Sequence, residues 1–209
     1  MKIMIRIRLS FLPIILIVLT SSFFFSASGR PPDFSSPQTV EAGVNFQQAD
    51  EDNPDRSPDR TQRKATLQAI TRMNRDKEKY SGAEIMDAER MYQIANKRFG
   101  SAEAKDSLES MLKKYPDMNR TGCAMLYLAQ MTSGEEREKW LQEAIDHHSD
   151  CMYGDGSQVG ALARMQLGYI YKDQGDMKKA TALFQEIRSG FADAVDHKGR
   201  LIISIIPAQ

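Results

Sequence analysis

The residues with the clearest capacity for chemistry lie between positions 147 and 157. His147, His148 and Cys151 stand close together at the end of a stretch with helical spacing. Imidazole and thiolate groups are zinc ligands, and a helix end brings residues three or four positions apart onto one side. A closed structural site needs a second group of ligands, which the sequence does not offer. The sequence therefore predicts neither a metal nor a cofactor, and these three residues are its candidates for a metal site.

Two acidic residues, Asp150 and Asp155, occur in the same segment as Gly154 and Gly156, a combination found in calcium loops. Such a loop requires more carboxylates and a later bidentate glutamate, which do not follow at the needed spacing. The motifs of serine hydrolases, zinc proteases and phosphate-binding loops are missing from the sequence. Catalysis would require His147 or His148 to act with Asp150 or Cys151 in one pocket. We therefore predict that the chain is not an enzyme.

The chain has two cysteines, Cys123 and Cys151. In an exported protein they could form a disulfide that ties the 147–157 segment to its neighbours. Alternatively, Cys123 lies among apolar residues and could be a small buried side chain. Both alternatives stay open, and so does a metal-binding or redox-active module built on residues 147–157.

The elements that would position these residues are helices. Two stripes of residues with helical spacing flank Gly175, which interrupts the pattern. The stripe before it consists of Leu167, Gly168 and Tyr171, and the stripe after it of Ala180, Phe184 and Ile187. A glycine in the first stripe lets the second helix approach closely, and Asp176 can cap that second helix. This spacing resembles the tetratricopeptide repeat (TPR), a helix-turn-helix unit of 34 residues.

A single hairpin of this kind cannot bury its apolar face, so further copies are expected. The same alternation of small and large residues recurs at Ala104, Leu108 and Met111, and more weakly at Leu141, Ala144 and Ile145. The predicted repeats are 85–117, 118–150 and 161–193, with an insertion at 150–160. The expected fold is all-α, a short right-handed solenoid of about three TPR-like hairpins plus flanking helices.

Two flanking helices are predicted from spacing. Ala65, Leu67, Ile70 and Met73 recur at helical intervals, which predicts a helix over 64–79 packed on the first repeat. A capping helix is expected over 194–206, and its apolar Leu201–Ile206 run would either be buried on the last hairpin or mediate formation of a homo-oligomer.

The first 29 residues have the pattern of an export signal. Lys2, Arg6 and Arg8 precede an apolar stretch, and small residues follow at Ser26–Gly29. The alternative is an uncleaved anchor, because the apolar stretch approaches the length of a short membrane span. Residues 30–62 are rich in proline and polar residues, which predicts a disordered linker before a domain at 63–209. The expected location is periplasmic or secreted, or membrane-anchored if the signal is kept.

The charge balance and the resemblance bear on partners. With 28 basic and 28 acidic residues the chain lacks the positive charge that nucleic-acid binding requires. The TPR resemblance implies a scaffold whose first helices line a groove for a peptide or a partner helix. Carried onto this sequence, the groove positions are Glu89, Gln93, Asn96, Lys97, Asn119, Gln130, Tyr169, Lys172 and Asp173. The sequence therefore predicts a protein-protein interaction scaffold of the bacterial cell envelope.

Overall fold

The computed structural model describes residues 57–208, and within this range the prediction of an all-α fold is confirmed. The α-helices in this range are α1 (Ser57–Lys79), α2 (Gly82–Lys97), α3 (Ala102–Lys114), α4 (Asn119–Met131), α5 (Gly134–His147), α6 (Val159–Asp173) and α7 (Met177–Gly190). A short 3-10 helix, η2 (Ile202–Ser204), follows. Extended pairing in the described range is limited to two isolated bridges, Met152 with Gln158 and Val195 with Leu201.

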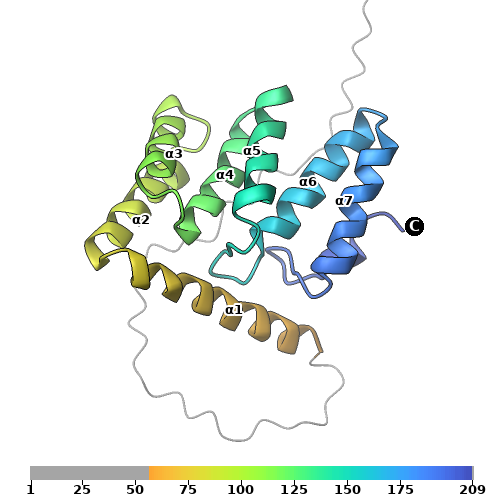
Figure 1. The fold of residues 1–209 in the computed structure, drawn as a ribbon, viewed down its shortest axis with the longest axis horizontal. Helices are drawn as coiled ribbons and strands as arrows, with labels where there is room; N and C mark the ends of the chain where they lie inside the picture. The colour runs from red at the N-terminus through yellow and green to blue at the C-terminus, as the bar shows by residue number, and fades with distance from the viewer. Residues whose placement is uncertain (1–56, 209) are drawn as a thin grey trace, which may run out of the picture. The chain divides into compact units, whose positions relative to one another are not determined.

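Helices α2 to α7 form three hairpins that follow one another along the chain. Helix α2 pairs with α3, α4 with α5 and α6 with α7, while α3 packs on α4 and α5 on α6 (Figure 1). The first helices α2, α4 and α6 also contact one another in order. The apolar residues expected in the second helices are buried between the hairpins: Ala104, Leu108, Met111, Leu141, Ala144, Ile145, Ala180, Phe184 and Ile187.

The last hairpin shows why its residue sizes matter. A Cβ atom on Gly168 would lie 2.7 Å from Cε1 of Phe184, so the ring occupies the space that any larger residue would need. Gly175 turns the chain with φ +84°, a left-handed conformation that favours glycine. The Asp176 carboxylate then accepts a hydrogen bond from the backbone N–H of Lys179 at 3.1 Å and caps α7, as the sequence predicts.

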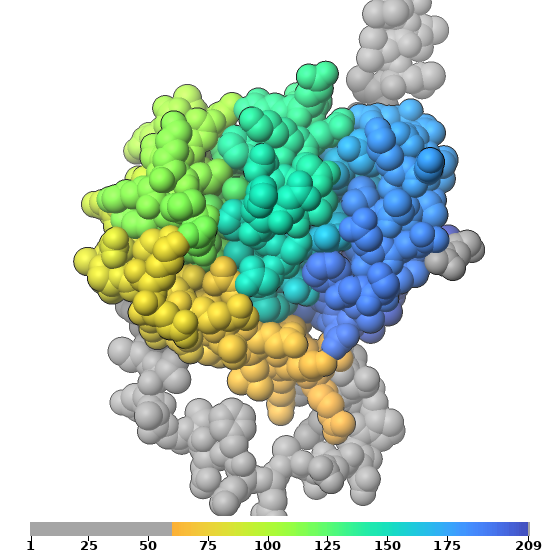
Figure 2. All heavy atoms as spheres, in the orientation of Figure 1, coloured from red at the N-terminus to blue at the C-terminus, as the bar shows by residue number. Residues whose placement is uncertain are grey.

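Helix α1 differs from the prediction in extent and in the face that it buries. It begins at Ser57, inside the predicted linker, because a proline in the first turn is compatible with a helix start. It runs across the ends of the hairpins and buries Ala65, Ala69, Arg72 and Asp76 (Figures 1 and 2). Leu67 and Ile70, which were expected to pack, are 62% and 46% exposed.

The small size of the buried residues explains this choice of face. The turn between α5 and α6 approaches α1 so closely that a Cβ atom on Gly156 would lie 2.7 Å from Ala65. Gly156 has φ +91°, so it combines a left-handed backbone with a close contact. Leucine or isoleucine cannot occupy this contact, and alanine can.

The predicted capping helix at 194–206 is wrong. Residues 194–201 form a turn instead, in which the Asp196 carboxylate accepts hydrogen bonds from the backbone N–H groups of Lys198 and Arg200, both at 2.9 Å. Side-chain acceptors of this kind compete with helix formation, and Gly199 with φ +74° completes the turn. The apolar run still packs on α6 and α7, with Ile202 and Ile206 buried.

The predictions of an export signal at 1–29 and of a linker from 30 to 56 lie outside the described residues. Within residues 57–208, no helix combines the length and the apolar character that crossing a membrane requires.

Candidate functional site

Polar side chains of two consecutive first helices, α2 and α4, form a continuous row. The Glu89 carboxylate pairs with Nη2 of Arg120 at 2.6 Å and accepts a hydrogen bond from Nε2 of Gln93 at 2.7 Å. Oε1 of Gln93 accepts from Nδ2 of Asn96 at 3.2 Å, and Oδ1 of Asn96 accepts from the hydroxyl of Tyr127. We call these five residues the first-helix row. It begins and ends on α4 and passes through α2.

Aromatic rings pack against the residues at both ends of the row. The Arg120 guanidinium lies over the ring of Tyr92, 4.6 Å from its centroid, a cation-π contact. Tyr127 lies 5.2 Å from Tyr92 and 5.6 Å from Phe99 between ring centroids. Tyr92 and Tyr127 are buried, whereas Phe99, in the turn after α2, is 52% exposed. These contacts fix the position of both ends of the row.

The row is suited to recognition of a peptide. Each amide group in it has hydrogen-bonding capacity left after its contacts within the row, because a primary amide offers two donors and an acceptor with two lone pairs. Such groups can bond to peptide backbone whatever its sequence. Since the row holds its own side chains in place, little conformational entropy remains to be lost on binding.

The structure brings together Glu89, Gln93 and Asn96, three of the predicted groove residues. Four others, Lys97, Gln130, Lys172 and Asp173, are exposed at the carboxyl ends of α2, α4 and α6. Tyr169 has a different role: its hydroxyl donates to the backbone carbonyl of Ile205 at 2.7 Å and its ring packs on Phe184. Tyr169 therefore anchors the C-terminal segment.

The structure corrects the prediction for Asn119, which is 2% exposed. Its amide Nδ2 donates to the carbonyl of Met152 and its Oδ1 accepts from the Met152 N–H, both at 2.8 Å. The Asn119 amide thus bonds both the N–H and the C=O of one loop residue, the pair of backbone hydrogen bonds that an adjacent β-strand would make. Its position in the row is taken by the next residue, Arg120.

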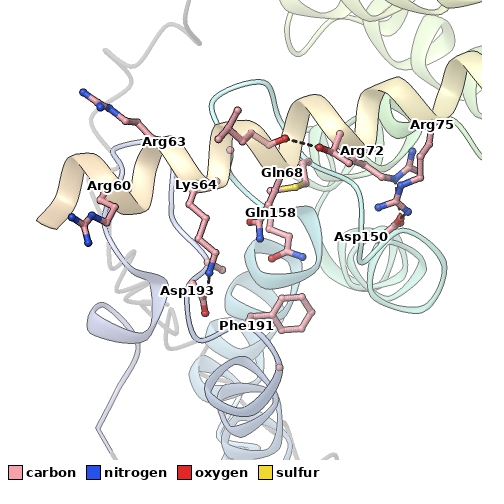
Figure 3. Close-up of a pocket in the computed structure, with 17 residues that line it drawn as sticks. Arg60, Arg63, Lys64, Gln68, Arg72, Arg75, Asp150, Gln158, Phe191 and Asp193 are labelled. Atoms are coloured by element: carbon pink, nitrogen blue, oxygen red, sulfur yellow. Dashed lines mark hydrogen bonds and ion pairs between the residues drawn. The ribbon is translucent and has the colours of Figure 1, made fainter. Parts of the chain in front are cut away.

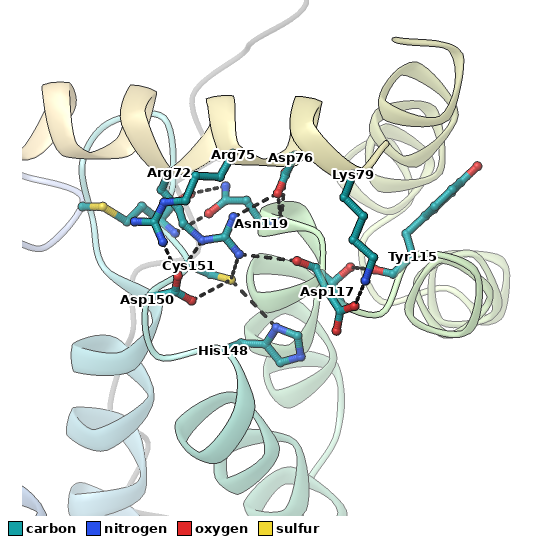
Figure 4. Close-up of polar contacts among 12 residues, drawn as sticks. Arg72, Arg75, Asp76, Lys79, Tyr115, Asp117, Asn119, His148, Asp150 and Cys151 are labelled. Atoms are coloured by element: carbon teal, nitrogen blue, oxygen red, sulfur yellow. Dashed lines mark hydrogen bonds and ion pairs between the residues drawn. The ribbon is translucent and has the colours of Figure 1, made fainter. Parts of the chain in front are cut away.

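Beneath α1, a second group of polar side chains joins the helix to the hairpin ends (Figure 4). Arg72 pairs with Asp76 at 2.9 Å and with Asp150 at 2.8 Å. The Asp76 carboxylate also accepts the backbone N–H of Asn119, at 3.1 and 3.0 Å to its two oxygens. Met118, the N-cap residue of α4, makes no capping hydrogen bond with its side chain. The Asp76 carboxylate of α1 therefore caps α4 from outside the helix.

Of the two alternatives left open for Cys123 and Cys151, the structure has the buried thiols. Cys123 and Cys151 are buried free thiols in the structure, so they form no disulfide here, and burial raises the pKa of each thiol to about 12. His148 lies with Nδ1 3.8 Å from the Cys151 sulfur, but His147 points elsewhere and pairs with Glu143. Among residues 57–208, no group of three or more potential ligands could hold a metal ion.

A serine, a histidine and an aspartate also meet, a contact that no spacing in the sequence indicates. Asp155 Oδ2 lies 2.8 Å from Nδ1 of His197, and Ser157 Oγ lies 3.1 Å from the same nitrogen. A catalytic triad needs the serine on one ring nitrogen and the carboxylate on the other. Because both groups share Nδ1, this contact joins the C-terminal turn to the α5–α6 loop and is not a proton relay.

Arg120 and Tyr127 are the residues of the row that sequence reasoning missed. Each lies 31 positions after its partner on α2, Glu89 for Arg120 and Asn96 for Tyr127. Residues 31 positions apart therefore lie side by side on α2 and α4. Applying this separation to Glu89 and Asn96 could have indicated both partners.

Comparison with protein-family models, with curated proteins and with solved structures finds no match to this chain.

Proposed function

We propose that this chain is a non-enzymatic protein-protein interaction scaffold of the TPR-like kind, exported to the bacterial cell envelope. It binds an extended peptide or a partner helix on the surface formed by α2, α4 and α6. The observation that carries this proposal is the first-helix row, in which polar side chains of two repeats are linked in fixed positions.

Two further observations support a binding role over a chemical one. The thiols are buried and their pKa values are raised to about 12, which disfavours a nucleophilic thiolate near neutral pH. Ser157 and Asp155 both contact the same ring nitrogen of His197, an arrangement that does not suit catalysis.

Two lysines at the edge of this surface indicate which charges a bound peptide would carry. Lys97 and Lys172 end the first helices α2 and α6 and are exposed. Ammonium groups in such places can hold carboxylates of a bound peptide. We therefore expect a partner segment that presents backbone to the amides of Gln93 and Asn96 and carboxylates to the two lysines.

Affinity capture with the full chain tests this function. The double variant Lys97→Glu and Lys172→Glu is compared with Lys113→Glu and Lys139→Glu, which makes the same change of charge at exposed positions of the second helices α3 and α5. The proposal predicts that the wild-type chain and the second-helix variant capture the same partner and that the first-helix variant loses it with helicity unchanged. Capture that survives the first-helix change would refute it.

A further inference from the structure

A groove of about 740 Å³ lies between α1 and the hairpin ends that α1 crosses, and its lining shares no residue with the first-helix row (Figure 3). Its other wall consists of the α5–α6 loop and the segment after α7. Phe191 lies in that wall, and Gln158 faces the groove across from Gln68 of α1.

Helix α1 lines this groove with one stripe of polar and cationic side chains. The residues recur at intervals of three or four, which places them on one helical face: Arg60, Lys64, Gln68, Thr71 and Arg75. At 1.5 Å per residue this stripe is about 22 Å long. An extended chain rises about 3.3 Å per residue, so the stripe matches about seven residues of peptide.

The groove carries an excess of positive charge. Five of its lining residues are arginine or lysine and two are aspartate. Both carboxylates have cationic partners: Asp193 pairs with Lys64, and Asp150 lies between Arg72 at 2.8 Å and Arg75 at 3.3 Å. Arg72 also pairs with Asp76, which lies outside the lining, so the five cationic side chains face three carboxylates in all. The groove therefore attracts anions although the whole chain has no net charge.

The shape of the groove and its uncharged lining residues favour an extended peptide as the bound anion. Gln68 and Gln158 lie in the groove between its cationic ends and can bond to peptide N–H and C=O groups. The exposed side chain of Leu67 and the ring of Phe191 provide apolar contacts along the same length. A recessed groove of this kind fits an extended chain better than it fits a flat lipid surface.

We propose that this groove is a second binding site, which takes an acidic, extended segment of a partner protein, about seven residues long. The carboxylates of the segment lie along the cationic stripe of α1, and its backbone bonds to Gln68 and Gln158. The site is separate from the first-helix row, so the scaffold would hold two partners, or two parts of one partner, at once.

The test measures binding of a labelled heptaglutamate peptide to the full chain by fluorescence anisotropy, at about 0.05 M salt where charges are weakly screened. Arg60→Glu with Arg75→Glu reverses both ends of the stripe, and Arg60→Gln with Arg75→Gln removes the charges alone. Lys113→Glu with Lys139→Glu is the matched control. The reversal replaces two attractions by two repulsions, each modest at an exposed position, so we expect the charge-reversed protein to bind about tenfold or more weakly.

The glutamine variant should fall between the wild type and the charge-reversed protein, and the matched control should bind as the wild type does. Heptalysine should not bind to the groove. The proposal is overturned if heptaglutamate does not bind the wild type, or if the control variant loses as much affinity as the groove variant. It is also overturned if the chain binds vesicles of phosphatidylglycerol and not the peptide, because that result would assign the groove to a membrane surface. None of these three outcomes decides the proposal for the first-helix surface, whose test changes Lys97 and Lys172.

Discussion

Replacing Asp76 by asparagine should weaken the attachment of α1 to the hairpins. Asp76 is 8% exposed and makes two kinds of contact, an ion pair with the buried Arg72 and a cap on the N-terminus of α4. Asparagine keeps the size of the side chain but removes its charge. Arg72 then keeps a carboxylate partner in Asp150, whose side chain is 56% exposed and therefore screened by water.

The magnitude follows from these two contacts. Loss of a helix cap costs about 0.5–2 kcal/mol, and breaking a buried ion pair costs about 3–5 kcal/mol when no partner is left. Because asparagine can still accept a hydrogen bond and Asp150 stays with Arg72, we take the lower part of these ranges. The expected loss in the free energy of unfolding is about 3 kcal/mol, or roughly 6–12 °C in Tm for a domain of this size.

Urea denaturation of the variant and of Glu78→Gln provides the assay. Glu78 is exposed on the same helix, and its change from carboxylate to amide is the same, so it should alter stability by less than about 0.5 kcal/mol. In hydrogen exchange, the amides of α1 in the Asp76 variant should exchange faster than those of α6 and α7. Equal stability of the two variants would refute the idea that Asp76 holds α1 in place.

Three further predictions concern the α5–α6 loop and the thiols around it. Gly156→Ala should lower the free energy of unfolding by about 1–3 kcal/mol, because φ is +91° and Ala65 lies in the way, whereas Gly82→Ala, which has open space, should not; equal thermal stability of the two would argue against this contact. Both cysteines should react with a thiol reagent at pH 8 only as fast as the whole domain unfolds, and a reductant should leave the mass of the protein unchanged. Rapid labelling of the folded chain would contradict their burial. Burial lowers the pKa of His148 below 6.5, so the unfolded chain binds more protons there and stability should fall as pH drops through 6.5; His148→Gln should flatten that part of the pH profile, and an unchanged profile would rule the histidine out.

The last hairpin could be predicted from sequence because its side chains have one arrangement that fits. Gly168 lies under Phe184, and Gly175 and Asp176 end one helix and begin the next, so local spacing is enough. The location of α1 could not be predicted in the same way. Its leucine and isoleucine suggested the buried face, but the contact distance at Gly156 admits only small residues, which depends on a loop about 90 positions away.

The first-helix row was predictable in part for a related reason. Glu89, Gln93 and Asn96 lie on one face of a single helix, so helical spacing alone places them together. Asn119 and Arg120 are adjacent, and which of them faces the row depends on how α4 rotates against the α5–α6 loop. That rotation follows from packing between distant segments. The C-terminal turn was missed because the hydrogen bonds of Asp196 outweigh the helical pattern of the apolar residues.

Site-specific photo-crosslinking in cells that produce the protein tests the central claim most directly. A photoreactive amino acid is placed, one position at a time, at Lys97, Gln130 and Lys172 on the first helices and at Lys113 and Lys139 on the second helices, all of them exposed. The proposed scaffold predicts one crosslinked partner at the first-helix positions and none at the second-helix positions. Crosslinks at the second-helix positions instead, or the same partner at all five, would contradict a binding surface on α2, α4 and α6.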